Sequence, residues 1–277
     1  MMTLQETTEL HNGIKMPVFG LGVYKIPDEQ QGMEAITYAI KSGYRLIDTA
    51  SLYDNEQAVG AAVRQSGIDR EDIFVTSKVW NTDQGYEETL KAFDTTLDKL
   101  GFDYLDLYLI HWPMPKQDKF KDTWRALEKL YEDKKVRAIG VSNFNINHLE
   151  DLKTTAKVLP MVNQVECHPH LNQQTLRDYC QAEGIKVQAW SPLKRGDLFE
   201  VDSLTEIAKA HKKSVAQVIL RWDYQHGILT IPKSVNKSRI EENADIFDFT
   251  LSEREMAQID ALHNGDRTGP NPEELNA

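Results

Sequence analysis

Apolar residues gather in short runs along the chain, and longer stretches with polar and apolar positions at helical spacing separate these runs. Eight runs are rich in β-branched and aromatic residues and do not alternate between polar and apolar, which is typical of strands buried on both faces. They span residues 18–24, 44–50, 73–79, 105–111, 136–143, 162–167, 186–192 and 228–233. The pattern therefore predicts a parallel sheet whose strands are connected by helices.

The intervening stretches are amphipathic and have the length of helices, and several end in a glycine at the position that commonly closes a helix. We expect helices over Glu29–Ser42, Glu56–Gln65, Glu87–Leu100, Lys121–Glu132, Gln173–Glu183, Asp202–His211, Val215–Gln225 and, after the last strand, Leu251–Leu262. The closing glycines are Gly43, Gly67, Gly101 and Gly184. Eight strand–helix units of roughly thirty residues each predict a (β/α)8 TIM barrel formed by residues 1–277 as a single domain.

A β-hairpin is expected before the first strand of the repeat. Asn12-Gly13 lies between residues 7–10 and 14–16, and Asn-Gly favours a type I′ turn, in which both residues have a positive φ. The competing architecture is an open doubly wound sheet, which would carry a GxGxxG sequence after its first strand to bind a dinucleotide. The chain has no such sequence, and neither a P-loop nor an HExxH sequence, so the barrel is favoured.

The net charge and the few cysteines of the chain indicate which binding partners and which cellular compartment to expect. The 277 residues carry a formal net charge of −11, which disfavours nucleic acids and anionic membranes. Two cysteines, Cys167 and Cys180, are typical of a reducing compartment, and the N-terminal residues lack the features of a signal peptide. The segment Cys167-His168-Pro169-His170 has no second Cys/His pair nearby, so we expect no metal site. We therefore expect a cytoplasmic monomer that acts on a small molecule and has no membrane or nucleic-acid partner.

Four titratable residues stand at or just after the ends of neighbouring strands. Asp48 ends the second strand and Tyr53 follows it, Lys78 ends the third strand, and His111 ends the fourth. Each of these side chains, taken alone, is more often a structural residue than a functional one. Because barrel enzymes place their chemistry at the carboxyl ends of the strands, the convergence of all four favours an active site.

These four residue types together are suited to giving a proton to a carbonyl oxygen. A free tyrosine has a pKa of ~10, and a lysine ammonium within ~4–6 Å lowers it, so Lys78 is expected to lower the pKa of Tyr53. A buried lysine needs an anion, which Asp48 can supply, and His111 can orient the carbonyl oxygen by a hydrogen bond. The sequence thus predicts that Tyr53 is the proton donor.

Three long segments carry a resemblance to a known family. GYRLIDTASLYDNEQAVG at 43–60, KLGFDYLDLYLIHWP at 99–113 and IPKSVNKSRIEEN at 231–243 resemble, in order and spacing, the three signatures of the aldo-keto reductase family. The similarity covers nearly the whole chain. It implies a barrel whose bottom the hairpin covers, a catalytic tetrad of Asp48, Tyr53, Lys78 and His111, and hydride transfer from a nicotinamide to a carbonyl carbon.

The resemblance also implies a cofactor site. Ser142, Asn143 and Gln164 match the positions that bind the nicotinamide carboxamide, Trp190 matches the aromatic residue that stacks on the nicotinamide, and Ser191, Pro192 and Leu193 would lie along the pyrophosphate. Other expected contacts are Gly22, Val23, Tyr24, Val235, Glu242 and Asn243, the last two at the adenine. Lys233, Ser234 and Arg239 follow the eighth strand and can hold a 2′-phosphate, which favours NADPH.

Tyr24, Trp80, His111 and Trp112 are expected to line the substrate pocket. Because the loop after the fourth strand and the C-terminal tail are short, we expect an open pocket that accepts small aldehydes, ketones and α-dicarbonyls such as glyoxal and methylglyoxal. The resemblance to bacterial glyoxal/methylglyoxal and diketogluconate reductases also allows a keto-sugar substrate.

Two other functions remain open from the sequence. A Schiff-base lyase could use Lys78, and relatives of this fold also serve as channel subunits or lens proteins. Lys194 and Arg195 depart from the family, in which many members carry a small residue at position 194. They are interpreted either as cofactor contacts or as a solvated pair.

Overall fold

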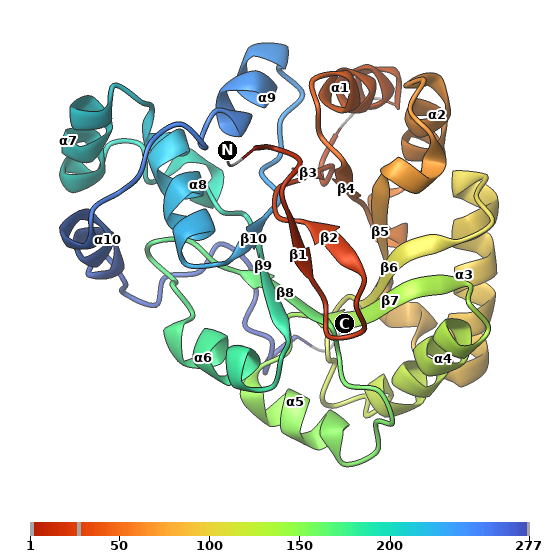
Figure 1. Cartoon of the computed structure of the whole chain (residues 1–277). Coiled ribbons are helices and arrows are strands. Elements are labelled where there is room, and N and C mark those ends of the chain that lie inside the picture. The colour runs from red at the N-terminus through yellow and green to blue at the C-terminus, as the bar shows by residue number, and fades with distance from the viewer. Residues whose placement is uncertain (1–2, 27–28, 276–277) are drawn as a thin grey trace.

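The computed structural model describes residues 3–26 and 29–275 of the chain. Two short strands, β1 (Thr7–Glu9) and β2 (Lys15–Pro17), form the predicted antiparallel hairpin. The hairpin lies across the end of the barrel that faces the viewer in Figure 1. Leu10 and Met16 bury their side chains in the core, so the hairpin covers the bottom of the barrel as expected.

The type I′ turn predicted at Asn12-Gly13 is wrong. Of the two residues only Gly13 has a positive φ, +82°. The Gly13 amide donates to the Leu10 carbonyl at 2.8 Å, and the Leu10 amide donates to the Ile14 carbonyl at 2.8 Å, so the loop is longer by one residue. The Asn12 side chain accepts from the Ile14 amide at 3.1 Å and donates to the Arg137 carbonyl at 3.0 Å, which fastens the loop to the barrel.

Eight parallel strands make the barrel, in the spatial order β10-β9-β8-β7-β6-β5-β4-β3. Their bounds are β3 (Leu21–Gly22), β4 (Leu46–Asp48), β5 (Phe74–Val79), β6 (Leu105–Ile110), β7 (Val136–Ser142), β8 (Val162–Glu166), β9 (Lys186–Trp190) and β10 (Leu229–Thr230). Bridges between Phe19 and Thr230 and between Gly22 and Lys233 join the first and last strands and close the sheet. A Cβ at Gly22 would lie 2.8 Å from the Ile231 carbonyl oxygen, so this seam requires a glycine.

Helices surround the sheet and connect its strands (Figure 1). They are α1 (Glu29–Lys41), α2 (Glu56–Gln65), α3 (Tyr86–Leu100), α4 (Phe120–Glu132), α5 (Ile146–Lys153), α6 (Gln174–Ala182), α7 (Asp202–His211), α8 (Val215–Gln225), α9 (Lys237–Ala244) and α10 (Glu253–Asp260). Eight of them match the predicted stretches to within two residues at each end. Helices α5 and α9 were not predicted. The four closing glycines all have the expected positive φ.

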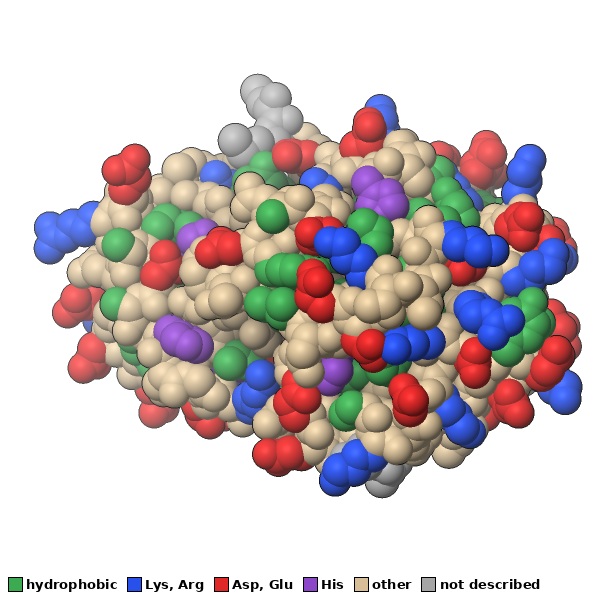
Figure 2. All heavy atoms as spheres, turned by 90° about the horizontal axis from the view of Figure 1, so that it is seen from below, with side chains coloured by type: hydrophobic (Ala, Val, Ile, Leu, Met, Phe, Trp, Pro, Cys, Tyr) green, Lys and Arg blue, Asp and Glu red, His purple; other side chains and the backbone are tan. Residues whose placement is uncertain are grey.

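The surface and the core fit a barrel with a filled interior. Strands β4, β5, β6 and β8 are buried along their whole length. On the face drawn in Figure 2, acidic and basic side chains are interspersed and hydrophobic side chains are scattered. Among the described residues no helix is both long enough and apolar enough to cross a membrane.

Candidate active site

The four predicted side chains come together at the carboxyl ends of β4, β5 and β6. Asp48 is the last residue of β4, Tyr53 closes a short 3₁₀ helix (Ser51–Tyr53), Lys78 lies in β5, and His111 follows β6. The Lys78 ammonium donates to Asp48 Oδ1 at 2.6 Å, to the Thr49 carbonyl at 2.9 Å and to the Tyr53 hydroxyl at 3.3 Å. Lys78 therefore connects the Asp48 carboxylate to the Tyr53 hydroxyl through hydrogen bonds.

Burial opposes the charge of both members of the Asp48–Lys78 pair. It raises the pKa of Asp48 and lowers the pKa of Lys78, and in each case the oppositely charged partner acts in the other direction. Neither side chain is more than 2% exposed. Because the three hydrogen bonds of Lys78 are directed into the protein, its amine is not free to attack a carbonyl, which argues against the Schiff-base alternative.

The pKa of Tyr53 is raised and not lowered, in contrast to the sequence prediction. Burial, followed by the negative charge of Asp48, raises the pKa of Tyr53 well above its ordinary value. Both effects disfavour the phenolate, because burial removes its solvation and the Asp48 carboxylate repels its charge. Tyr53 consequently keeps its proton at neutral pH and can give it only to a stronger base, such as an alkoxide.

His111 is a neutral imidazole in this surrounding. Burial, followed by the charge of Lys78, lowers the pKa of His111 well below its ordinary value. Its Nδ1 is buried and has no hydrogen-bond partner within the described residues. The ring lies edge-on to Trp80 at 5.0 Å and to Tyr53 at 5.7 Å between centroids. A neutral imidazole can donate one N–H to an oxygen placed beside Tyr53.

The predicted substrate-binding aromatic residues differ in their position and exposure. The ring of Tyr24 lies 4.8 Å from that of Tyr53 and is 45% exposed. Trp112 is almost completely buried, and the Gln84 amide donates to its carbonyl at 2.7 Å. Tyr24 thus lies beside Tyr53 and Trp80 beside His111, whereas Trp112 is buried.

A second group of predicted residues forms a connected polar layer beside the tetrad. Gln164 donates from its side-chain amide to Asp48 Oδ2 at 2.6 Å and to Gln188 Oε1 at 2.7 Å. The Asn143 amide donates to the His111 carbonyl at 3.0 Å, and its Oδ1 accepts from Trp190 Nε1 at 2.8 Å. The layer therefore ties Asp48, His111 and the Trp190 indole into one network.

Asn143 and Ser142 follow one another at the end of β7. Asn143 has a left-handed φ of +64°, a conformation that asparagine tolerates better than most residues. The Ser142 hydroxyl donates to the Gln164 carbonyl at 2.7 Å. Both residues are more than 95% buried, which restricts their side chains to one arrangement at this end of the barrel.

The residues predicted to bind the adenosine part of a cofactor follow β10, at the seam where the last strand meets the first. Lys233 follows β10, and Arg239 lies in the first turn of α9, where its amide is capped by Asn236 Oδ1 at 3.3 Å. Both side chains are exposed, and in the described part of the chain neither forms an ion pair with a carboxylate. Two unpaired cations at the start of a helix suit a phosphate group.

The other predicted cofactor residues are divided between surface and interior. Ser234 is buried, and its hydroxyl accepts from the Asn236 amide at 3.1 Å, so it shapes the turn before α9. Asn243 is buried, whereas Glu242 is exposed on α9. Pro192 is buried, and Ser191, Leu193 and Val235 are half-buried.

Gly22 pairs with Asp48 in the sheet, and the Val23 amide donates to the Asp48 carbonyl at 3.1 Å.

Two polar residues at the mouth were missed at the level of sequence. Asn55 donates to the Val23 carbonyl at 2.9 Å and accepts from the Thr49 hydroxyl at 2.6 Å, so it holds the loop of Tyr53 against the first strand. Glu166 is a buried carboxylate at the end of β8. The position of Glu166 at a strand end was a usable signal, as it was for Asp48.

The segment Cys167-His168-Pro169-His170 has a structural role at the end of β8. His168 Nε2 lies 3.0 Å from Glu166 Oε1, and Cys167 is completely buried. Among the residues that the structure describes, no three histidine, cysteine, aspartate or glutamate side chains converge on a point that could hold a metal ion.

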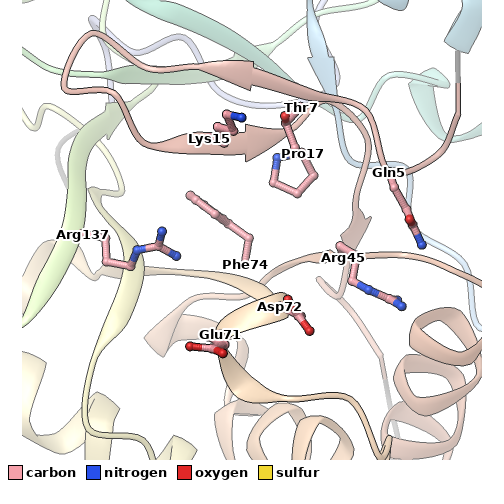
Figure 3. A pocket seen from close by; sticks show the side chains of 9 residues that line it. All are labelled: Gln5, Thr7, Lys15, Pro17, Arg45, Glu71, Asp72, Phe74 and Arg137. Carbon is pink, nitrogen blue, oxygen red and sulfur yellow. The ribbon is translucent and has the colours of Figure 1, made fainter.

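A further cavity, of about 480 Å³, lies at the opposite end of the barrel, beneath the hairpin. Figure 3 shows the side chains that line it, among them Lys15, Arg45, Glu71, Asp72 and Arg137. It contains none of the tetrad residues. The charges of both signs around it fit a solvated cleft between hairpin and barrel.

A closed parallel barrel with a Lys–Asp–Tyr–His cluster at the carboxyl ends of its strands defines the class of the aldo-keto reductases. The sequence profile of the Aldo/keto reductase family matches residues 18–264, and the chain belongs to this family. This confirms the fold and the family that the sequence predicted.

Individual relatives match over almost their entire length. The chain is 60% identical to a glyoxal reductase of Bacillus subtilis (strain 168), covering 99% of this chain and 98% of that protein. It is 42% identical to the methylglyoxal reductase DkgA of Yersinia pestis, covering 98% of both. Among solved structures, a mutant of Gox0644 in complex with NADPH is 40% identical, with a TM-score of 0.94 and 98% of both chains covered.

Proposed function

We propose that this chain reduces small aldehydes and α-dicarbonyls, such as glyoxal and methylglyoxal, with NADPH. The observation that carries the proposal is the hydrogen-bonded set in which Lys78 connects Asp48 to the Tyr53 hydroxyl, with neutral His111 alongside. The family membership and the NADPH complex of a similar chain support the choice of cofactor.

The residues of the mouth fit this cofactor. Exposed, unpaired Lys233 and Arg239 suit the 2′-phosphate that distinguishes NADPH from NADH. Both amide hydrogens of Gln164 are used within the protein, so its Oε1 is the atom left to accept from a carboxamide. The face of Trp190 is suited to stacking on a nicotinamide ring, because its Nε1 is held by Asn143 at 2.8 Å. When bound, NADPH supplies the hydride to the carbonyl carbon.

The protein supplies the proton and the orientation. His111 donates an N–H to the carbonyl oxygen and holds it next to the Tyr53 hydroxyl. Because its pKa is raised, Tyr53 remains protonated until negative charge develops on that oxygen, and it then transfers its proton to the more basic alkoxide. Lys78 donates a hydrogen bond to the phenol oxygen and stabilises it as the proton leaves, and Asp48 keeps the ammonium charged in its buried place.

The open mouth supports small and varied substrates. Tyr24 is 45% and Leu52 is 41% exposed beside Tyr53, so apolar surface faces solvent where a substrate would enter. The names of the similar glyoxal and methylglyoxal reductases agree with an α-dicarbonyl substrate. A keto sugar of the diketogluconate type is the alternative.

A substrate panel tests the proposal. NADPH absorbance is followed with the purified chain and glyoxal, methylglyoxal, aromatic aldehydes, aldoses or keto sugars in turn. The expected result is the highest kcat/KM with the α-dicarbonyls. If kcat/KM is highest with a keto sugar, keto sugars and not α-dicarbonyls are the preferred substrate class. If no carbonyl causes NADPH consumption, the proposal is overturned.

The cofactor assignment has its own test. Arg239→Ala is expected to weaken NADPH binding by about tenfold or more, the effect of losing a charge-assisted hydrogen bond, and to leave NADH binding nearly unchanged. Arg254→Ala, on exposed α10, is the matched control. Equal losses for NADPH and NADH in Arg239→Ala would contradict the 2′-phosphate contact.

A further inference from the structure

Residues 264–269, here called the C-terminal strap, are held to the end of β8 by one buried carboxylate. Glu166 Oε1 accepts from the Thr268 amide at 2.5 Å and from the Thr268 hydroxyl at 2.7 Å, and Oε2 accepts from the Gly269 amide at 3.1 Å. Although burial opposes its charge, the hydrogen bonds from His168, Thr268 and Gly269 hold the pKa of Glu166 at about 2. The carboxylate is therefore ionised across the physiological range and binds the strap throughout it.

Lys194 provides the second anchor of the strap. Its side chain is 7% exposed, and its ammonium forms an ion pair with Asp266 and lies 3.1 Å from His170 Nδ1. The His170 carbonyl accepts from the Gly265 amide at 3.0 Å, and Arg195 donates to the Thr268 carbonyl at 3.3 Å. Lys194 and Arg195, unassigned from the sequence, thus fasten the loop after β9 to the strap.

The strap ends against the indole of Trp190. A Cβ added to Gly269 would lie 2.5 Å from Trp190 Cη2, closer than real Cβ atoms approach, and 3.3 Å from both Trp190 Cζ2 and Glu166 Oε2. At its other end the indole donates from Nε1 to Asn143 Oδ1 at 2.8 Å. The indole is consequently held at its nitrogen by a side-chain amide and packed at its six-membered ring against the backbone of the strap.

We infer that the C-terminal strap is a positioning element for Trp190, with Gly269 as the residue that makes room for an indole and Glu166 as the residue that holds Gly269 in place. The inference rests on the proposed function in one respect: the positioned ring is the one that would stack on the nicotinamide. Stacking depends on the tilt of the two rings, so a displaced indole loses part of that contact. Glu166 and Gly269 act on the cofactor only through the ring.

The direct test is Gly269→Ala, with binding of NADPH measured by isothermal titration calorimetry. Gly269 has no positive φ, so alanine introduces no backbone strain; its severe contact is with the ring, and its Cβ would also lie 3.3 Å from Glu166 Oε2. We expect NADPH to bind about threefold to tenfold more weakly, the factor that one aromatic pair contributes. Glu273→Gln is the matched control, because Glu273 holds the same tail to Asn145 and Asn147 on α5 and does not contact Trp190. It should bind NADPH as the wild type does.

A double-mutant cycle separates a contact with the ring from a general structural effect. Trp190→Tyr removes the part of the indole that contains Cη2 and Cζ2, so the added methyl group at position 269 then has space. In the Trp190→Tyr background, Gly269→Ala is expected to change NADPH affinity less than twofold. An equal loss in both backgrounds, or wild-type affinity in Gly269→Ala, would overturn the inference.

Two readouts without cofactor keep this test independent of the proposed function. The Trp190 Nε1–H resonance in NMR spectra should shift in Gly269→Ala, because the ring moves relative to Asn143. Glu166→Gln should speed hydrogen exchange of the Thr268 and Gly269 amides, whereas Gly269→Ala should leave Thr268 exchange unchanged. An unshifted indole resonance would overturn the inference about the strap and would leave the proposed function unaffected. Absence of NADPH binding to the wild type would overturn the proposed function, while the resonance would still report on the strap.

Discussion

Asp48→Asn removes the charge that compensates the buried ammonium of Lys78. At an effective dielectric constant of about 20, two unit charges 2.6 Å apart attract each other by about 6 kcal/mol, part of which offsets the desolvation of both ions. Removing one partner of such a pair costs about 3–5 kcal/mol, because the other charge stays buried. We therefore expect the free energy of unfolding at pH 7 to fall by about 3–5 kcal/mol.

The pH dependence of the variant makes this prediction specific. Without Asp48 the pKa of Lys78 is depressed further in the folded state, while in the unfolded state it is ~10.4, so the unfolded chain binds more protons between these values. The stability of Asp48→Asn should therefore rise with pH in that interval. Urea unfolding at pH 7 and pH 9 measures it, with Asp48→Asn/Lys78→Met as the control that should recover stability. A loss below about 1 kcal/mol with no dependence on pH would mean that Asp48 does not compensate a buried charge on Lys78.

Two further predictions concern buried carboxylates away from the active site. Burial raises the pKa of Asp223 well above its usual range, so its contribution to stability is present below pH ~4 and is lost as the pH rises through the folded value. In Asp223→Asn the free energy of unfolding should decline less steeply with pH, by up to about 1.4 kcal/mol per pH unit, as measured by urea unfolding between pH 5 and 8. A slope equal to that of the wild type would contradict a raised pKa of Asp223. Asp106 accepts from Arg70 at 2.8 Å and Arg137 at 2.7 Å at the far end of the barrel. Asp106→Asn should lower the free energy of unfolding by about 3 kcal/mol and leave kcat unchanged in a steady-state assay; a fall in kcat with intact stability would contradict this separation.

Much of the fold could be predicted because buried parallel strands and amphipathic helices leave strong patterns. Helices α2, α7 and α8 begin and end where the sequence predicted. Helix α9 was missed because KSRIEENA is mostly polar and has few buried residues to mark a period. Helix α5 is only eight residues long and buries three of them, which leaves a similarly weak pattern.

The candidate site could be predicted as a set of residues but not as a network. The strand ends gave Asp48, Tyr53, Lys78 and His111, since each follows an apolar run. No sequence feature gives the partner of a polar side chain across the barrel, so the bonds from Gln164 to Asp48 and from Trp190 to Asn143 were not foreseen. The same limit explains the wrong prediction for Tyr53, whose pKa is raised by burial and then by the charge of Asp48.

Lys194 illustrates a second limit. Its neighbours Arg195 and Gly196 suggest an exposed turn, yet its ammonium lies in the protein beside His170 and Asp266. The strap that buries it lies far along the chain, with Asp266 72 positions after Lys194. Only the folded chain brings them together, and this is why the strap was not predicted.

Tyr53→Phe isolates the role of the phenol as proton donor, because it removes one hydroxyl and keeps the ring. NADPH affinity, measured by calorimetry, should stay within about threefold of wild type, since the phenol is assigned to the substrate side of the mouth. The kcat for methylglyoxal reduction should fall by about 10²–10⁴-fold, the contribution of a positioned general acid. A kcat within about tenfold of wild type, in a variant that still binds NADPH, would contradict the assignment of Tyr53 as the proton donor.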